Sequence, residues 1–219
     1  MVKDSTAIDL RKFTPPVAVG AAKLGGGDPP PVRPSAPLAA NAWLAVLMFL
    51  GAEAMFFAGL IGAYLVFRIS APFWPPPFQP RLPVIVTGLN TAVLLSSAWT
   101  MRLALHAGRR DERTALVHYL GVTALLGSLF LAVQGFEWLE LIRFGLTVSS
   151  SVYGGLFYTL IGFHAAHVLG ALVWLAIVFV WARQGRYTKA SHVGLQTCHM
   201  YWTFVVALWP VLYGLVYLY

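Results

Sequence analysis

The sequence is poor in charged residues and in cysteine. Only 11% of its 219 residues are Asp, Glu, Lys or Arg, whereas 58% are hydrophobic. A soluble domain carries about 25% charged residues, so this composition argues against one and is typical of a polytopic membrane protein. The single cysteine, Cys198, excludes an internal disulfide and a metal site built on several thiolates. The net charge of +7 would suit nucleic acid, but the basic residues lie in short segments between apolar runs, so no nucleic-acid partner is expected.

Five long apolar runs make up most of the chain after residue 40. Each reaches the ~20 apolar residues that an α-helix needs to cross a bilayer. The sequence therefore predicts an all-α, polytopic membrane protein whose five-helix domain covers residues 41–219. The predicted transmembrane helices lie at about 42–69, 84–105, 116–142, 151–182 and 193–219. Residues 1–40 are rich in proline and glycine, which predicts a flexible N-terminal tail because such a segment buries too little apolar surface to offset its ordering entropy.

The distribution of basic residues predicts the orientation of these helices. Twelve of the fifteen Lys and Arg residues lie in the tail and around the second-to-third and fourth-to-fifth connections. The other three, Arg68, Arg81 and Arg143, lie toward the opposite side. By the positive-inside rule the N-terminus is cytoplasmic and the C-terminus lies outside, as an odd number of helices requires.

Glu53 is the one charged residue of the first span before Arg68. It lies about 18 Å along the helix from Asn41 at a rise of about 1.5 Å per residue, which places it well inside the bilayer. An ionisable residue at that depth is a functional hypothesis by default. Two interpretations stay open: a carboxyl that is hydrogen-bonded at a helix contact, and a carboxyl that tunes a proton or lipid site.

His164 and His167 form a second polar feature, inside the uncharged run of residues 145–182. Their spacing places both on one side of the helix, near mid-membrane depth. Shared ligation of one haem is disfavoured, because its two ligands approach from opposite faces. A metal site would need further ligands from other helices, such as Glu53 or Glu137. We expect hydrogen bonds to buried carboxyls instead, with Glu53 and His164 as the predicted pair.

Two more carboxylates and three tryptophans stand near the ends of the predicted spans. We expect Glu140 to be solvated at the interface and Glu137, one step further in, to make a structural contact. Trp138, Trp181 and Trp209 are predicted to line the membrane interface or to contact lipid.

Five segments follow one another in the order found in the haem–copper oxidase subunit III family. They are L-M-F-L-G-A-E-A-M-F-F-A-G (Leu47–Gly59), L-N-T-A-V-L-L-S-S (Leu89–Ser97), Q-G-F-E-W-L-E (Gln134–Glu140), S-V-Y-G-G-L-F-Y-T-L-I-G-F-H-A-A-H-V (Ser151–Val168) and Y-W-T-F-V (Tyr201–Val205). The chain resembles the five-helix form of that family over about residues 44–213. One such motif is weak evidence for the resemblance, whereas five motifs in the family's order with short gaps are specific to it.

The resemblance implies a subunit of a respiratory terminal oxidase in the bacterial inner membrane, where the complex reduces dioxygen to water and pumps protons. In this family, haem and copper are carried by partner subunits I and II, to which the electron donor, cytochrome c or quinol, also binds. The implied role of this chain is non-catalytic: it supports assembly, phospholipid binding, proton uptake and sustained turnover. The implied buried polar or proton-linked residues are Glu53, Glu137, His164 and His167, with Gln134, Glu140, His199, Tyr201 and Trp202 as secondary candidates.

The last helix departs from the family pattern. Thr203 and Val206 replace the usual His and Asp of the closing motif, Gln196 replaces an upstream carboxylate, and His199 is an additional polar residue. This leaves an accessory subunit of a nitric oxide reductase as an alternative. A small transporter is the alternative from another class, although there is no internal repeat and no helix pair broken by Gly or Pro. A dihaem anchor would need histidines at matched depths on different helices.

Overall fold

The computed structural model describes residues 36–76, 82–187 and 192–219, with side chains from residue 41 onward. Its regular structure within these ranges is entirely helical. The helices are α1 (Ala36–Ser70), α2 (Val84–Arg109), α3 (Arg113–Arg143), α4 (Val152–Arg183) and α5 (Val193–Tyr213), followed by a π-helical turn at Gly214–Leu218. Residues 36–40, predicted to belong to the tail, form the first turn of α1, and the rest of the predicted tail lies outside the described residues.

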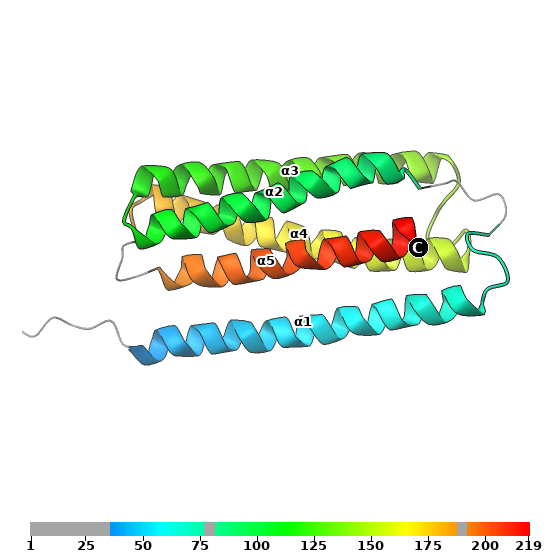
Figure 1. Cartoon of the computed structure of the whole chain (residues 1–219), viewed down its shortest axis with the longest axis horizontal. Coiled ribbons are helices and arrows are strands. Elements are labelled where there is room, and N and C mark those ends of the chain that lie inside the picture. Colours follow the sequence, from blue (N-terminus) through cyan, green and yellow to red (C-terminus); the bar gives the residue numbers. More distant parts are fainter. Residues whose placement is uncertain (1–35, 77–81, 188–191) are drawn as a thin grey trace, which may run out of the picture. The chain divides into compact units, whose positions relative to one another are not determined.

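Five helices of the described chain are long and apolar enough to cross a membrane, which confirms the predicted number and class. The shortest spans, α2 and the segment Val193–Leu218 that joins α5 to the π-helical turn, have 26 residues each. A helix of that length extends about 39 Å, more than the ~30 Å hydrocarbon core. Consecutive helices run antiparallel, since each connection returns the chain to the end at which the next helix begins (Figure 1). The side of the membrane on which each terminus lies stays a prediction.

The core lies among α2, α3, α4 and α5. Buried positions recur every three or four residues on α2, so one face of this helix points inward. That face carries Thr87, Asn90, Thr91, Leu94, Ser97 and Met101. Small residues allow close helix contacts in membranes, and Gly127 of α3 is such a case: a Cβ there would lie 2.5 Å from the indole ring of Trp202.

Helix α1 lies at the margin of this bundle, beside α4 and α5 (Figure 1). From residue 41 to its end it buries only two side chains, Phe57 and Tyr64. Leu50, Leu60 and Ile61 are partly buried against the core, and most of its other large apolar side chains are exposed. In a membrane these side chains meet lipid or another subunit.

The start of α4 is fixed by two hydrogen bonds. The hydroxyl of Ser151 accepts from the backbone N–H of Gly154 at 3.1 Å, which satisfies one of the free donors at the helix start. The hydroxyl of Tyr158 donates to the carbonyl of Leu146 at 2.9 Å. These contacts hold the α3–α4 connection against α4 and set the position of the two histidines further along it.

Candidate functional site

A carboxyl–imidazole pair joins α1 to α4. Nε2 of His167 lies 2.8 Å from Oε2 of Glu53, and both side chains are less than one-fifth exposed, at 17% and 18%. Phe56 and Phe57 pack against the imidazole ring, with centroid distances of 6.3 and 5.0 Å. The pair thus sits at a helix contact walled by aromatic rings, at the depth predicted for Glu53.

The hydrogen bonds of His167 fix how many protons the pair holds. Nδ1 lies 2.6 Å from the carbonyl oxygen of Phe163, which can only accept, so Nδ1 carries a proton. One further proton lies between Nε2 and the Glu53 carboxyl, either on the nitrogen or on the oxygen. An imidazolium with a carboxylate and an imidazole with a carboxylic acid both have zero net charge. The two side chains therefore share one proton at the α1–α4 contact without leaving an isolated charge in hydrocarbon.

His164 is not the partner of Glu53, so that prediction is wrong. It lies in the core, fully buried, with its ring stacked on Trp209 at 4.9 Å and edge-on to Phe130 at 6.4 Å. The reason is geometric: residues three apart on an α-helix differ in direction by about 60°. His167 therefore faces α1, whereas His164 faces α3 and α5.

Glu137 is the centre of a second polar group, at the other side of the bundle. Its Oε2 accepts from the hydroxyl of Thr87 at 2.9 Å and from the side-chain amide of Gln134 at 3.1 Å. The same amide nitrogen lies 3.3 Å from the hydroxyl of Tyr217. Gln134 and Glu137 stand one helical turn apart, which is why the Q-x-x-E spacing brings them together. The group links α2 and α3 to the turn after α5, as expected of a structural contact.

Glu140 is placed differently from Glu137. It pairs with Arg143 at 2.8 Å, and the two side chains are 36% and 73% exposed. Exposed pairs of this kind contribute about 0–1 kcal/mol. Glu140 is thus solvated, and the structure does not bring it into the Glu137 group.

Two of the three secondary candidates on α5 have clear contacts. Trp202 is buried and donates from Nε1 to the hydroxyl of Ser97 on α2 at 3.1 Å. The ring of Tyr201 packs between Phe49 of α1 and Trp174 of α4, at 5.8 and 5.6 Å. Tyr201 thereby adds an aromatic contact to the same α1 interface that the Glu53–His167 pair occupies.

His199, the third candidate, lies near the start of α5 and the end of α2, beside Arg102, Arg109 and His106. It joins neither the Glu53–His167 pair nor the Glu137 group. The residues described contain no group of three or more His, Cys, Asp and Glu side chains that could hold a metal ion.

The tryptophans show what the sequence prediction missed. Trp209 is fully buried and donates from Nε1 to the hydroxyl of Thr91 at 2.8 Å, so its predicted place in lipid is wrong. Trp181 is 40% exposed, in agreement with a membrane-facing side chain. Because Thr91 and Ser97 stand on the inward face of α2, the spacing of polar residues in that helix is the signal that pointed to buried partners.

Comparison with known proteins gives one consistent result. The family model described as "Cytochrome c oxidase subunit III" matches residues 37–219. "Cytochrome c oxidase subunit 3" of Synechocystis sp. is 38% identical over 174 residues, which are 79% of this chain and 73% of that protein. "Probable cytochrome c oxidase subunit 3" of Nocardia farcinica is 34% identical over 78% of this chain and 84% of its own length. "Cytochrome c oxidase subunit 3" of Thermostichus vulcanus is 32% identical over 80% of this chain and 86% of its own length.

The family model covers all five helices from residue 37 onward, including the segments that carry Glu53, Glu137 and both histidines of α4. The chain belongs to the cytochrome c oxidase subunit III family and is a multi-pass membrane subunit of a haem–copper oxidase complex.

Proposed function

We propose that this chain is a non-redox subunit of its oxidase, placed in a bacterial inner membrane beside the subunits that carry haem and copper. In this proposal subunits I and II reduce dioxygen and translocate protons, and the electron donor, cytochrome c or quinol, binds to them. This chain supports assembly, phospholipid binding, proton uptake and sustained turnover. The comparisons favour neither the nitric oxide reductase subunit nor the transporter.

The observation that carries the proposal is how the intramembrane polar side chains are used. Glu53 and His167 join α1 to α4, and Glu137 with Gln134 joins α3 to α2 and to the turn after α5. His164 has aromatic rings on two sides. The carboxyl groups are thus engaged at separate helix contacts rather than converging on one centre, and neither ring nitrogen of His164 has a hydrogen-bond partner among the described residues. That pattern supports a structural and proton-linked role.

The Glu53–His167 pair gives the proposal its proton-linked part. It holds one proton between two groups, and a shallow pocket of about 320 Å³ beside the pair is lined by Ala52, Phe56 and Phe163. The pair is therefore positioned to exchange its proton with a neighbouring subunit, in keeping with the implied support of proton uptake.

The test compares the purified oxidase with a preparation from which this chain has been removed. We expect both to retain the same haem and copper content per catalytic subunit and similar initial rates of oxygen uptake. The preparation without this chain should then lose activity during turnover. Loss of haem or copper in proportion to the loss of this chain would contradict a non-redox role.

A further inference from the structure

The carboxyl group of Glu137 has one oxygen that the hydrogen bonds described above do not use. The side chain is 5% exposed, and its Oε1 is buried without a partner among the described residues, whereas Oε2 faces Thr87 and Gln134. Glu137 lines a pocket of about 220 Å³ between the start of α2 and the end of α3. The other lining residues are Pro83, Val86, Phe136, Glu140, Leu141 and Phe144. An unpaired oxygen of a nearly buried carboxyl group thus stands at the wall of a cavity.

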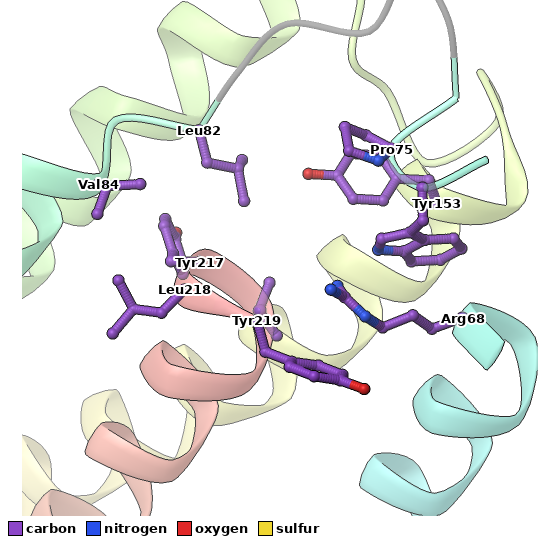
Figure 2. A pocket seen from close by; sticks show the side chains of 10 residues that line it. Arg68, Pro75, Leu82, Val84, Tyr153, Tyr217, Leu218 and Tyr219 are labelled. Atoms are coloured by element: carbon purple, nitrogen blue, oxygen red, sulfur yellow. The ribbon is translucent and has the colours of Figure 1, made fainter.

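Glu137 has no cationic partner in the described part of the chain, since none of the ion pairs found there includes it. The groups that face it are a hydroxyl from α2, an amide from α3 and the phenol of Tyr217 from the turn after α5. Arg68 lines a separate pocket together with Tyr217, and its guanidinium lies over the ring of Tyr219 (Figure 2). Because an isolated carboxylate is costly in hydrocarbon, these surroundings favour a carboxyl group that takes up a proton.

The hydroxyl of Thr87 offers the Glu137 carboxyl an acceptor as well as a donor. Its Oγ1 lies 2.9 Å from Oε2 of Glu137 and also 2.9 Å from the carbonyl oxygen of Pro83. A hydroxyl has one proton and two lone pairs, whereas a carbonyl oxygen only accepts. With an ionised carboxyl group, Thr87 donates to Oε2. With a protonated one, the O–H at Oε2 donates to Thr87, whose own proton turns to Pro83. Proton uptake therefore needs the rotation of one hydroxyl and no shift of either helix.

Glu140 gives the pocket a polar side toward water. It lines the same cavity as Glu137, and its side chain is 36% exposed in an ion pair with Arg143. The two carboxyl groups stand three residues apart on α3, which is a rise of about 4.5 Å. A water molecule takes about 30 Å³ in the liquid, so a cavity of about 220 Å³ holds several. Water in the pocket therefore joins Oε1 of Glu137 to the solvated carboxylate of Glu140.

We propose that Glu137 is a second proton-binding site of this chain, which exchanges its proton with the aqueous phase at the end of α3 through the pocket that Glu140 lines. Uptake converts the carboxylate and one proton from solvent into a carboxylic acid, and no other covalent bond changes. Gln134 donates to Oε2 in both states, so the contact between α2 and α3 persists. The site is separate from the Glu53–His167 pair. This inference rests on the geometry of α2 and α3 and not on the non-redox role proposed above.

The test is infrared difference spectroscopy of the purified oxidase, perfused with buffers of different pH in water and in deuterium oxide. The intact complex should show a carbonyl band of a protonated carboxyl group that disappears as the pH is raised and shifts on transfer to deuterium oxide. Glu137→Gln should abolish this band, and Glu137→Asp, which keeps a carboxyl group, should shift it. Glu53→Gln is the matched control, because it removes a carboxyl group at a different helix contact and should leave the band in place.

Variants of Thr87 and Glu140 test the hydrogen-bond switch and the path to water separately. Thr87→Val removes the acceptor of the proton at Oε2 and should move the band to higher frequency, whereas Thr87→Ser keeps the hydroxyl and should leave the band in place. Glu140→Leu makes that side of the pocket apolar and should slow the deuterium shift, and Glu140→Gln should slow it less.

A band that persists unchanged in Glu137→Gln would overturn the proposal, as would a Glu137 band that does not exchange with deuterium. An unshifted band in Thr87→Val would contradict the hydrogen-bond switch. Size-exclusion chromatography verifies that each variant complex retains this chain.

Discussion

Removing the link between Glu53 and His167 should loosen α1 from the rest of the bundle. Glu53→Ala, His167→Ala and the double variant form a thermodynamic cycle around a contact of 2.8 Å that is less than one-fifth exposed. Hydrogen bonds to charged groups contribute about 1.5–3 kcal/mol in proteins, whereas interhelical polar contacts in a membrane protein average about 0.6 and reach about 1.7 kcal/mol. Because the pair is only partly enclosed, we expect a coupling energy of about 1–1.5 kcal/mol.

The coupling energy can be measured by unfolding the purified chain from dodecylmaltoside micelles with sodium dodecyl sulfate, with helix content as the signal. Each single variant should lower the free energy of unfolding, and the double variant should lower it by less than the sum. Glu140 and Arg143 supply a matched control cycle, whose coupling should be no more than about 0.5 kcal/mol because that pair is exposed. Additive losses in the Glu53–His167 cycle would refute the assignment of this contact. In a double-mutant cycle of Glu53 with His164, which do not contact each other, the losses of unfolding free energy should be additive.

Three further predictions follow from the packing and from one connection. Trp209→Phe removes a buried 2.8 Å hydrogen bond and should lower the free energy of unfolding by about 1–2 kcal/mol. Trp181→Phe, on the membrane-facing side, should change it by less than about 0.5 kcal/mol in the same titration, and equal effects would contradict the placement. Gly127→Ala puts a Cβ 2.5 Å from an indole ring and should lower the free energy of unfolding by about 1–3 kcal/mol. Gly135→Ala, whose Cβ meets no atom within 4 Å, should not lower it. A larger loss in Gly135→Ala than in Gly127→Ala would contradict this packing. Burial, with a smaller contribution from a nearby thiol, raises the pKa of Tyr187 to about 12 from 10.0. Its stabilising contribution is therefore complete below pH 10 and is lost as the pH rises through about 12. The absorbance of tyrosinate near 295 nm should show a late component that Tyr187→Phe abolishes; ionisation of that component near pH 10 would disprove the burial.

The number and order of the helices could be predicted from the sequence because charge is almost absent from the spans. Glu53 and Glu137 were also found this way, since an ionisable residue at membrane depth stands out against an apolar background. The expected contact between Glu53 and a histidine of α4 presupposed that α1 and α4 are neighbours, and the Glu53–His167 pair shows that they are.

The choice between two histidines could not be predicted in the same way. His164 and His167 share one side of α4, and the rotation of that helix decides which of them meets α1. About 60° separates their directions, which is less than spacing alone resolves. The rotation depends on packing against α3 and α5, where the rings of Phe130 and Trp209 enclose His164.

Trp209 illustrates a second limit. In a membrane protein an apolar side chain is as compatible with lipid as with the protein interior, so hydropathy does not distinguish the two faces of a helix. Only a polar partner does so, and here it is Thr91 on α2. The regular spacing of hydroxyl and amide side chains on α2 was therefore the more informative pattern.

The central claim is that this chain is an oxidase subunit whose redox centres belong to its partners, and purification through an affinity tag on this chain tests it most directly. Mild extraction should recover stoichiometric larger subunits, haem, copper and oxygen uptake. Subsequent release of this chain in stronger detergent should leave all haem and copper with the other subunits. Recovery of the chain alone and colourless after gentle extraction, or of haem or copper with the released chain, would contradict the claim.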